Sequence, residues 1–179
     1  MKHSIAVVLY NPTWPQQFAE EAQRIAGVLG AVALRIEHNG STAVPGLAAK
    51  PIIDIQVSVA ELKPLDAFRL PLQSIGYRHV PHADDSFCPF FHRPAGWPHT
   101  HHVHVVKAGD AEEQRTLAFR DYLRAHSEVA AQYAQLKQRL ASELHGDTPE
   151  SREAYAIAKT EFVERAIAAA FHEGHPRGL

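Results

Sequence analysis

The stretch that decides the fold is NGSTAVPGLAAKPIIDIQVSV, residues 39–59. A polar loop beginning at Asn39-Gly40-Ser41 leads into the run PIIDIQVSV (51–59). In this run apolar and polar side chains alternate with the period of two that is typical of a β-strand. The run therefore predicts a strand with one apolar face for the core and one polar face. The apolar face carries Ile53, Ile55, Val57 and Val59, and the polar face carries Asp54, Gln56 and Ser58.

The loop before this strand has the composition of a phosphate-binding loop. A Gly-Ser step such as Gly40-Ser41 exposes backbone N–H groups beside a hydroxyl, and such a concavity holds phosphate oxygens. Lys50 adds positive charge, and Asp54 supplies the hard oxygen ligand that Mg²⁺ prefers when it also carries substrate phosphates. The alternative, which we weight equally, is a tight loop followed by an aspartate that faces solvent.

Composition limits the classes of partner. The chain has 179 residues, of which 45% are hydrophobic, which predicts a single domain (1–179) with a helix-plus-sheet portion (1–108) and a helical portion (109–179). With 18 Lys+Arg against 20 Asp+Glu, the net charge of -2 gives no reason to expect a nucleic-acid partner. The one cysteine, Cys88, excludes an internal disulfide, and we expect it to be a buried core thiol. No apolar run approaches the ~20 residues of a membrane span. We therefore expect a cytoplasmic protein without a membrane partner, and the sequence does not indicate an oligomeric state.

The pattern of apolar residues predicts an α+β fold. Thr13 and Gln16 form a possible capping box at the start of the first helix. Three strands in residues 77–107 are expected to form a meander, and the rest of the chain from residue 111 is expected to be helical, with a break near Ser127. The other expected elements are a helix over 13–29, strands over 33–38 and 51–59, a helical segment within 61–76, and a last helix over 149–173.

The strand HHVHVV (101–106) places His102 and His104 on one face. If it lies beside the strand of Asp54, one carboxylate and two imidazoles converge, a set that suits Zn²⁺, Mn²⁺ or Fe²⁺ better than Mg²⁺. Alternatively His104 is a general base or contacts phosphate as an imidazolium. The plain alternative is two histidines on a half-exposed strand.

The C-terminal helices offer cations. Lys137 follows Tyr133 by four residues, and Lys159 follows Tyr155 by four, so each pair shares a helix face. Each lysine lies next to the apolar stripe, where it either extends along the core to solvent or points into a cleft. Together with Arg120, the two pairs predict a phosphate-binding cleft between the two portions of the chain.

Five segments together resemble the signature of the GrpB family, which also occurs as an extra domain fused to some bacterial dephospho-CoA kinases. The resemblance implies a nucleotidyltransferase-like fold related to the polymerase-β superfamily, with a mixed sheet, an N-terminal helix and a C-terminal helical half. In that superfamily a Gly-Ser loop precedes a strand with two metal-binding carboxylates one residue apart. The segments are HNGSTAVPGLAAKPIIDIQV (38–57), HTHHVHVV (99–106), FRDYLRAH (119–126), YAQLK (133–137) and YAIAK (155–159).

Carried over to this sequence, the resemblance implies that Gly40, Ser41 and Thr42 form the phosphate loop and that Asp54 is the first metal-binding acid. The position of the second acid holds Gln56. An amide oxygen is a weaker, uncharged ligand, whereas two-metal chemistry needs carboxylates that hold two cations about 3.5–4 Å apart. This departure weakens the case for a standard two-metal site.

Three hypotheses follow. The first is a nucleotidyltransferase that binds a nucleoside triphosphate with Mg²⁺ or Mn²⁺ and transfers a nucleotidyl group to an unknown small acceptor. The second, favoured by Gln56, is a non-catalytic module that binds a nucleotide or another phosphorylated metabolite. The third is a transition-metal enzyme that uses Zn²⁺ or Fe²⁺ on His102 and His104, although the helical portion argues against a cupin-like barrel. Across these hypotheses we predict Asp54 and His104 as catalytic residues and Asp54, His102 and His104 as metal ligands, with Zn²⁺ or Fe²⁺ as the cation if the histidines bind it. The predicted ligand-binding residues are Gly40, Ser41, Thr42, Lys50, Arg120, Tyr133, Lys137, Tyr155 and Lys159.

Overall fold

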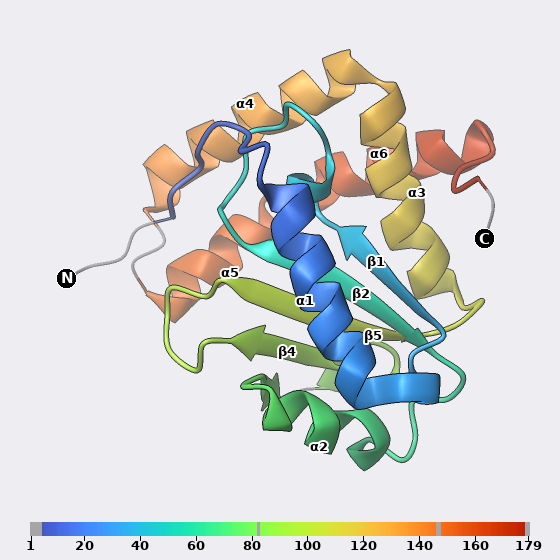
Figure 1. Ribbon diagram of the computed structural model, residues 1–179. Helices are drawn as coiled ribbons and strands as arrows, with labels where there is room; N and C mark the ends of the chain where they lie inside the picture. Colours follow the sequence, from blue (N-terminus) through green and yellow to red (C-terminus); the bar gives the residue numbers. More distant parts are fainter. Residues whose placement is uncertain (1–4, 82, 146–147, 178–179) are drawn as a thin grey trace.

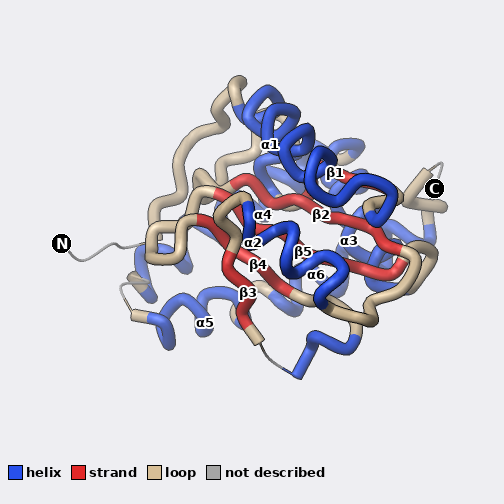
Figure 2. Tube along the Cα trace, turned by 60° about the horizontal axis from the view of Figure 1, so that its bottom comes forward, coloured by secondary structure: helices blue, strands red, loops and turns tan. Residues whose placement is uncertain are grey.

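The computed structural model describes residues 5–81, 83–145 and 148–177. A five-stranded mixed sheet, in the order β1-β2-β5-β4-β3, lies between two layers of helices. Helices α1 and α2 cover one face, and α3 to α6 lie on the other (Figures 1 and 2). The α+β fold class is therefore confirmed. The strands are β1 (Arg35–Asn39), β2 (Ile53–Val59), β3 (Arg78–Val80), β4 (Phe90–Arg93) and β5 (His101–Lys107). The helices are α1 (Trp14–Leu29), α2 (Asp66–Ser74), α3 (Ala111–Ala125), α4 (Ser127–Leu144), α5 (Pro149–Ile157) and α6 (Thr160–His172).

The pairing of β2 with β5 fixes the geometry that matters for function. These two strands are parallel, and their register places Asp54 opposite His102 and Gln56 opposite His104. The expected adjacency of the aspartate strand and the histidine strand is confirmed. Strands β3, β4 and β5 pair antiparallel in sequence order, so the expected meander is also present. No helix among the described residues is long and apolar enough to cross a membrane.

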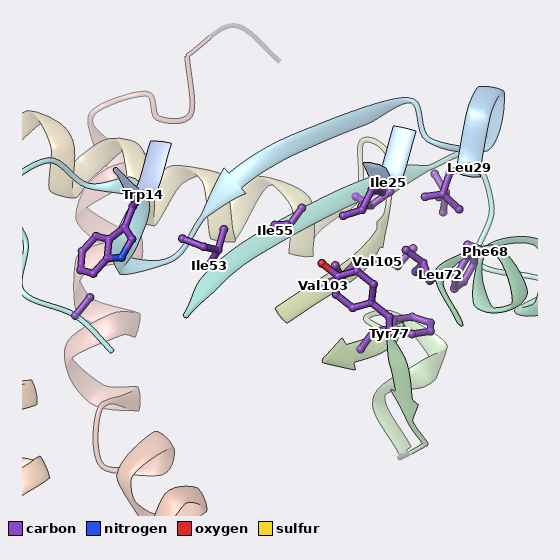
Figure 3. Packing of buried hydrophobic residues seen from close by; sticks show 14 residues of the cluster. Trp14, Ile25, Leu29, Ile53, Ile55, Phe68, Leu72, Tyr77, Val103 and Val105 are labelled. Carbon is purple, nitrogen blue, oxygen red and sulfur yellow. The ribbon is translucent and has the colours of Figure 1, made fainter. Parts of the chain in front are cut away.

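The apolar face of the sheet forms the main core. Side chains of β2 and β5, such as Ile55 and Val105, pack against Ile25 of α1 and Phe68 of α2 (Figure 3). All four side chains are fully buried. Burial of one such side chain contributes roughly 1.5–3 kcal/mol, so this layer holds β2 in place on the side away from the polar residues.

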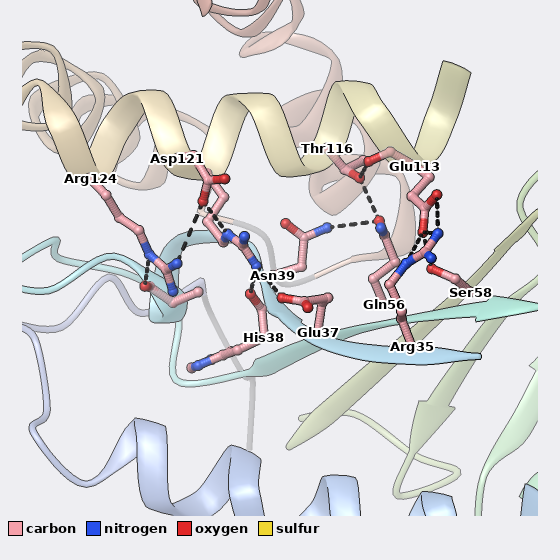
Figure 4. A network of polar contacts seen from close by, with 12 residues as sticks. Arg35, Glu37, His38, Asn39, Gln56, Ser58, Glu113, Thr116, Asp121 and Arg124 are labelled. Atoms are coloured by element: carbon pink, nitrogen blue, oxygen red, sulfur yellow. Dashed lines mark hydrogen bonds and ion pairs between the residues drawn. The ribbon is translucent and has the colours of Figure 1, made fainter. Parts of the chain in front are cut away.

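The polar face of β2 is covered by α3 rather than by solvent. Gln56, Ser58 and Glu113 have no exposed surface. The Glu113 carboxylate accepts hydrogen bonds from the Arg35 guanidinium at 2.6 Å and from the Ser58 hydroxyl (Figure 4). It also accepts one from the Gly109 N–H at 2.6 Å. Burial alone raises the pKa of Glu113, but these hydrogen bonds outweigh it and hold the pKa below its usual value. The alternation along β2 therefore separates an apolar buried face from a polar face on which Gln56 and Ser58 are buried too.

Two details of the predicted helices are wrong. Thr13 makes no capping box with Gln16, because its backbone N–H and its hydroxyl both donate to the Asn11 side chain. The last predicted helix is two helices, α5 and α6, that meet at Ala158-Lys159. Helix α5 packs on α4 whereas α6 packs on α3, so the chain must turn between them.

Candidate functional site

A cavity of about 340 Å³ opens between the polar side of the sheet and helices α4 and α5. Its wall combines the loop after β1, the facing ends of β2 and β5, and side chains from the two helices. Of the twelve residues proposed from sequence for the site, Arg120 is the one that does not line it. The other eleven are Gly40, Ser41, Thr42, Lys50, Asp54, His102, His104, Tyr133, Lys137, Tyr155 and Lys159.

One carboxylate and two imidazoles meet on the sheet side of this cavity. The ligand atoms of Asp54, His102 and His104 all lie within 4.8 Å of one another. His102 Nδ1 lies 3.2 Å from Asp54 Oδ1, and its Nε2 lies 3.0 Å from Nδ1 of His99. Burial raises the pKa of Asp54, but the hydrogen bond from His102 and the positive charge of Lys50 are among the contacts that outweigh burial and hold the pKa below its usual value. The aspartate is therefore an anion at neutral pH.

The donor set fits a divalent transition cation better than Mg²⁺, because two nitrogens and one oxygen form it. Burial lowers the pKa of His104 to about 4, so its imidazole is neutral and its lone pair is available near pH 7. Gln56 does not complete the set. Its Oε1 accepts hydrogen bonds from Thr116 Oγ1 at 2.5 Å and from Asn39 Nδ2 at 3.3 Å (Figure 4). Its buried Nε2 has no hydrogen-bond partner in the described part of the chain.

The loop after β1 lies directly against Asp54. Gly40 has φ 64° and ψ -168°, a conformation that favours glycine, and a Cβ there would lie 2.4 Å from Asp54 Oδ2. A single 3₁₀ turn, Ser41–Ala43, follows, and the first N–H groups of such a turn lack partners within it. The Thr42 hydroxyl donates to Ile52 O at 3.3 Å and lies 3.0 Å from His38 Nε2, so this side chain holds the loop in place.

Three lysines face the carboxylate across the cavity. Lys137 Nζ donates to Ser41 Oγ at 3.0 Å and lies 4.7 Å from the centre of the Tyr133 ring. The Tyr155 ring has Lys159 Nζ 4.4 Å from its centre and Lys50 Nζ 5.2 Å from its centre. The expected shared helix face is confirmed for Tyr133 and Lys137, which both lie in α4. It is wrong for Tyr155 and Lys159, because α5 ends at Ile157 and Lys159 directly precedes α6, although its Nζ still lies over the Tyr155 ring. All three lysines line the cavity.

The surroundings of these lysines disfavour their charged forms. Burial, followed by repulsion from Lys159, lowers the pKa of Lys137 to about 7. Burial and repulsion from Lys50 lower the pKa of Lys159 to about 8, and burial also lowers the pKa of Lys50. Among the residues that the structure describes, Asp54 is the one carboxylate that lines this cavity. When all three lysines are protonated, the cavity therefore carries an excess of positive charge.

This charge has a measurable effect on stability. In the unfolded chain a lysine has a pKa of about 10.4, so between pH 7 and that value the unfolded state binds more protons than the folded state. Stability is therefore expected to rise with pH in this range. We expect Lys137→Met, at a side chain only 3% exposed, to reduce that rise by roughly 1–2 kcal/mol between pH 7 and 9. Urea denaturation of the ligand-free protein at pH 7, 8 and 9 measures this, and equal slopes in wild type and variant would contradict it.

Arg120 does not line the cavity and has a structural role. Its Nη1 donates to Glu37 Oε2 at 2.7 Å and to the His38 carbonyl at 3.1 Å, and its Nε donates to Asp121 Oδ1 at 2.7 Å. Arg124 of the same helix donates to the Ala43 carbonyl (Figure 4). The two arginines hold α3 against β1 and the loop, because their guanidinium groups find acceptors on both.

A second chamber, of about 300 Å³, adjoins the first and was not predicted from sequence. The two chambers share Gly40, Asp54, His104 and Phe119. Cys88, expected in the core, is half-buried and lines this chamber, with Sγ 3.9 Å from His104 Nδ1. No spacing of residues in the sequence predicts this chamber, because it forms only where the first turns of α3 meet the polar face of β2. The rest of its wall consists of Asn39, Gln56, Glu112, Arg115, Thr116, Val163 and Ile167.

Comparison with known families decides the classification. The family model described as GrpB protein matches residues 4–169. The chain belongs to the GrpB family. UPF0157 protein PA4798 of Pseudomonas aeruginosa is 42% identical over 182 residues, covering 98% of this chain and 73% of that protein. UPF0157 protein YqkA of Bacillus subtilis is 36% identical over 166 residues, covering 92% of this chain but only 47% of that protein. This GrpB-family chain thus spans about half the length of YqkA.

Solved structures agree with this classification. The crystal structure of the conserved protein GrpB from Enterococcus faecalis is 36% identical, with a TM-score of 0.83 over 94% of this chain and 98% of that chain. A Cid1 poly(U) polymerase bound to MgGTP is 14% identical, with a TM-score of 0.52 over 75% of this chain and 44% of that chain. This confirms the nucleotidyltransferase-like fold. A dephospho-CoA kinase of Mycolicibacterium paratuberculosis is 31% identical over 167 residues, covering 80% of this chain and 41% of the kinase.

Proposed function

We propose that this GrpB-family protein binds the triphosphate of a nucleotide together with one divalent cation, and transfers a nucleotidyl group to a small acceptor. The observation that carries the proposal is the arrangement of Lys50, Lys137 and Lys159 around one carboxylate in a confined cavity. Partly dehydrated ammonium groups with too few anions favour a multiply charged anion, and the chain of phosphates in a nucleotide matches this requirement.

Each part of the cavity has a role in this proposal. The lysines and the N–H groups that begin the Ser41–Ala43 turn bind phosphate oxygens. Asp54 and His102 hold the cation, which neutralises charge on the phosphates when bound. A hydroxyl oxygen of the acceptor forms a bond to the α-phosphorus, the bond to the pyrophosphate breaks, and His104 takes the hydroxyl proton. Alternatively, a ring nitrogen of His104 would coordinate the cation, and His104 would then not accept the proton.

The second chamber supplies a place for the acceptor. Asp54 and His104 line this chamber as well as the first one, so an acceptor there lies next to the proposed phosphate site. Its wall combines Phe119 with the polar side chains of Thr116, Glu112 and Arg115. This mixture suits a small molecule with hydroxyl groups and an apolar face.

Calorimetry of ATP, GTP, CTP and UTP with MnCl₂ or MgCl₂ tests the binding step. Binding is expected to take up protons at pH 8, because phosphates raise the pKa of Lys137 and Lys159 from about 7 and about 8. Buffers with different ionisation enthalpies reveal this uptake. Affinity is accordingly expected to fall as pH rises from 7 to 9, the opposite direction to the stability of the ligand-free protein.

Lys159→Met is expected to weaken triphosphate binding at least tenfold, because a hydrogen bond to a charged group contributes about 1.5–3 kcal/mol. Lys107→Met is the matched control, since Lys107 lies at the end of β5 and pairs on the surface with Glu61 at 2.9 Å. The proposal fails if none of the four nucleotides binds, or if the two variants bind equally well.

A second candidate is a module that binds the nucleotide without transfer. The engaged Oε1 of Gln56 favours it, because the site then offers a single carboxylate for cations. Release of pyrophosphate from a bound nucleoside triphosphate, measured with a range of small polyols and amino alcohols as acceptors, separates the two. Binding with no pyrophosphate release across these acceptors favours the module.

A further inference from the structure

A second cluster of metal-ligating side chains lies where the end of α6 meets the α3–α4 junction. His126 stands between α3 and α4, while Glu173 and His175 follow α6. The ligand atoms of these three residues lie within 4.8 Å of one another, and His126 Nε2 is 2.8 Å from Glu173 Oε2. None of the three lines either chamber of the proposed nucleotide site. The cluster is therefore a separate feature of the molecule.

The state of His175 points to a ligand. Its side chain belongs to a residue only 7% exposed, and both ring nitrogens are buried without a hydrogen-bond partner among the described residues. Buried polar groups in folded proteins almost always have a partner, because desolvation without one is costly. His126 and Glu173 are partly exposed beside it, with side-chain exposures of 33% and 41%. The buried imidazole thus adjoins two partly exposed groups that can also coordinate an ion.

The backbone holds His175 in this position. Gly174 has φ 78°, which turns the chain back after α6. The Gly174 N–H donates to the Phe171 carbonyl at 3.1 Å, and the His175 N–H donates to the Ala170 carbonyl at 2.9 Å. The His175 ring packs edge-on against Tyr122 with 6.2 Å between ring centres. These contacts fix the backbone and the ring of His175 next to the ligand atoms of His126 and Glu173.

We propose that His126, Glu173 and His175 bind a transition-metal dication of the Zn²⁺ class. Two imidazoles and one carboxylate match the preference of Zn²⁺ for nitrogen and oxygen ligands, with the fourth position open to water. A cavity of about 720 Å³ is lined in part by Gly174, His175 and Pro176, so it adjoins the cluster on the side of His175. The ion ties the segment after α6 to the α3–α4 corner, so its role is to hold the C-terminal part of the helical layer in place.

Zinc titration of untagged protein, stripped with EDTA, tests the site by calorimetry. Because the Asp54 cluster can also bind zinc, the titration is done in an Asp54→Ala/His102→Ala parent. The parent is expected to bind one equivalent of ZnCl₂, and the same protein with His175→Ala is expected to bind none. Glu173→Gln, which keeps the shape of the side chain but removes a direct ligand, is expected to weaken binding roughly 100-fold or more. MgCl₂ is expected to give no binding in the parent.

His172→Ala is the matched control, because His172 is exposed at the end of the same helix and is not part of the cluster. A parent that fails to fold is replaced by wild type, where Glu173→Gln and His172→Ala are compared by the visible absorption of added Co²⁺. The site is supported if His175→Ala or Glu173→Gln loses one equivalent of bound zinc, or the visible absorption of bound Co²⁺, while His172→Ala does not. Equal metal binding in these variants and the His172→Ala control overturns it.

Discussion

Asp54→Asn is expected to uncouple the cation from the nucleotide. In wild type, Mn²⁺ and a nucleoside triphosphate are expected to strengthen each other's binding, because Asp54 and His102 would hold a cation that offsets the charge of the phosphates. The asparagine keeps the shape and can still pair with His102, so the fold is expected to persist. Loss of a ligand at a metal costs more than the 10–100-fold typical of outer-shell changes, so we expect Mn²⁺ affinity to fall roughly 100-fold or more.

The sign of the effect without metal makes this prediction specific. Asp54 repels phosphate, so in EDTA the Asp54→Asn variant is expected to bind the triphosphate at least as well as wild type. Asp66→Asn is the control, since Asp66 is an exposed acid on α2 whose side chain pairs with Arg69. Titrations with and without Mn²⁺ measure both effects. If Mn²⁺ enhances nucleotide binding equally in Asp54→Asn and in wild type, Asp54 does not hold the cation.

The strand pattern predicted which side chains would meet, because alternation needs only local geometry. Asp54, His102 and His104 each fall on the polar side of a clear strand, and the parallel pairing of β2 and β5 then brings them together. The Tyr133-Lys137 pair was predictable for the same reason, since four residues span about one helical turn. For these residues the local period was sufficient to identify the cavity wall. Lys159 follows the end of α5, so its place beside Tyr155 did not depend on the helical period.

The polar network was not predictable, because it depends on the docking of α3. Arg120 looked like a phosphate ligand by its charge, yet Glu37 lies within reach once α3 packs on β1. Gln56 looked like a weakened metal ligand, but Thr116, sixty residues along the chain, accounts for its oxygen. The second chamber and the break between α5 and α6 have the same cause, since both follow from how helices pack on one another. Contacts between segments that are distant in the chain produce no periodic pattern of residues in the sequence.

Gly40→Ala is expected to damage both the fold and the site. The backbone at Gly40 has φ 64°, which costs an alanine roughly 1–3 kcal/mol, and the new Cβ would lie 2.4 Å from Asp54 Oδ2. Crowding of this kind in a packed region adds about 1–3 kcal/mol. We expect the free energy of unfolding to fall by roughly 2–6 kcal/mol and the cation affinity to fall with it, because the aspartate must move. Urea denaturation and Mn²⁺ titration measure the two effects.

The Gly46→Ala variant separates the cost of a positive φ from the effect of a contact with Asp54. Gly46 also has a positive φ, 78°, but a Cβ there meets nothing within 4 Å. Its substitution is therefore expected to cost roughly 1–2 kcal/mol of stability and to leave Mn²⁺ affinity unchanged. The difference between the two variants then reports the contact between the loop and Asp54 rather than the cost of the backbone conformation. If both variants bind Mn²⁺ as wild type does, the loop does not position the carboxylate, and the close approach at Gly40 serves packing alone.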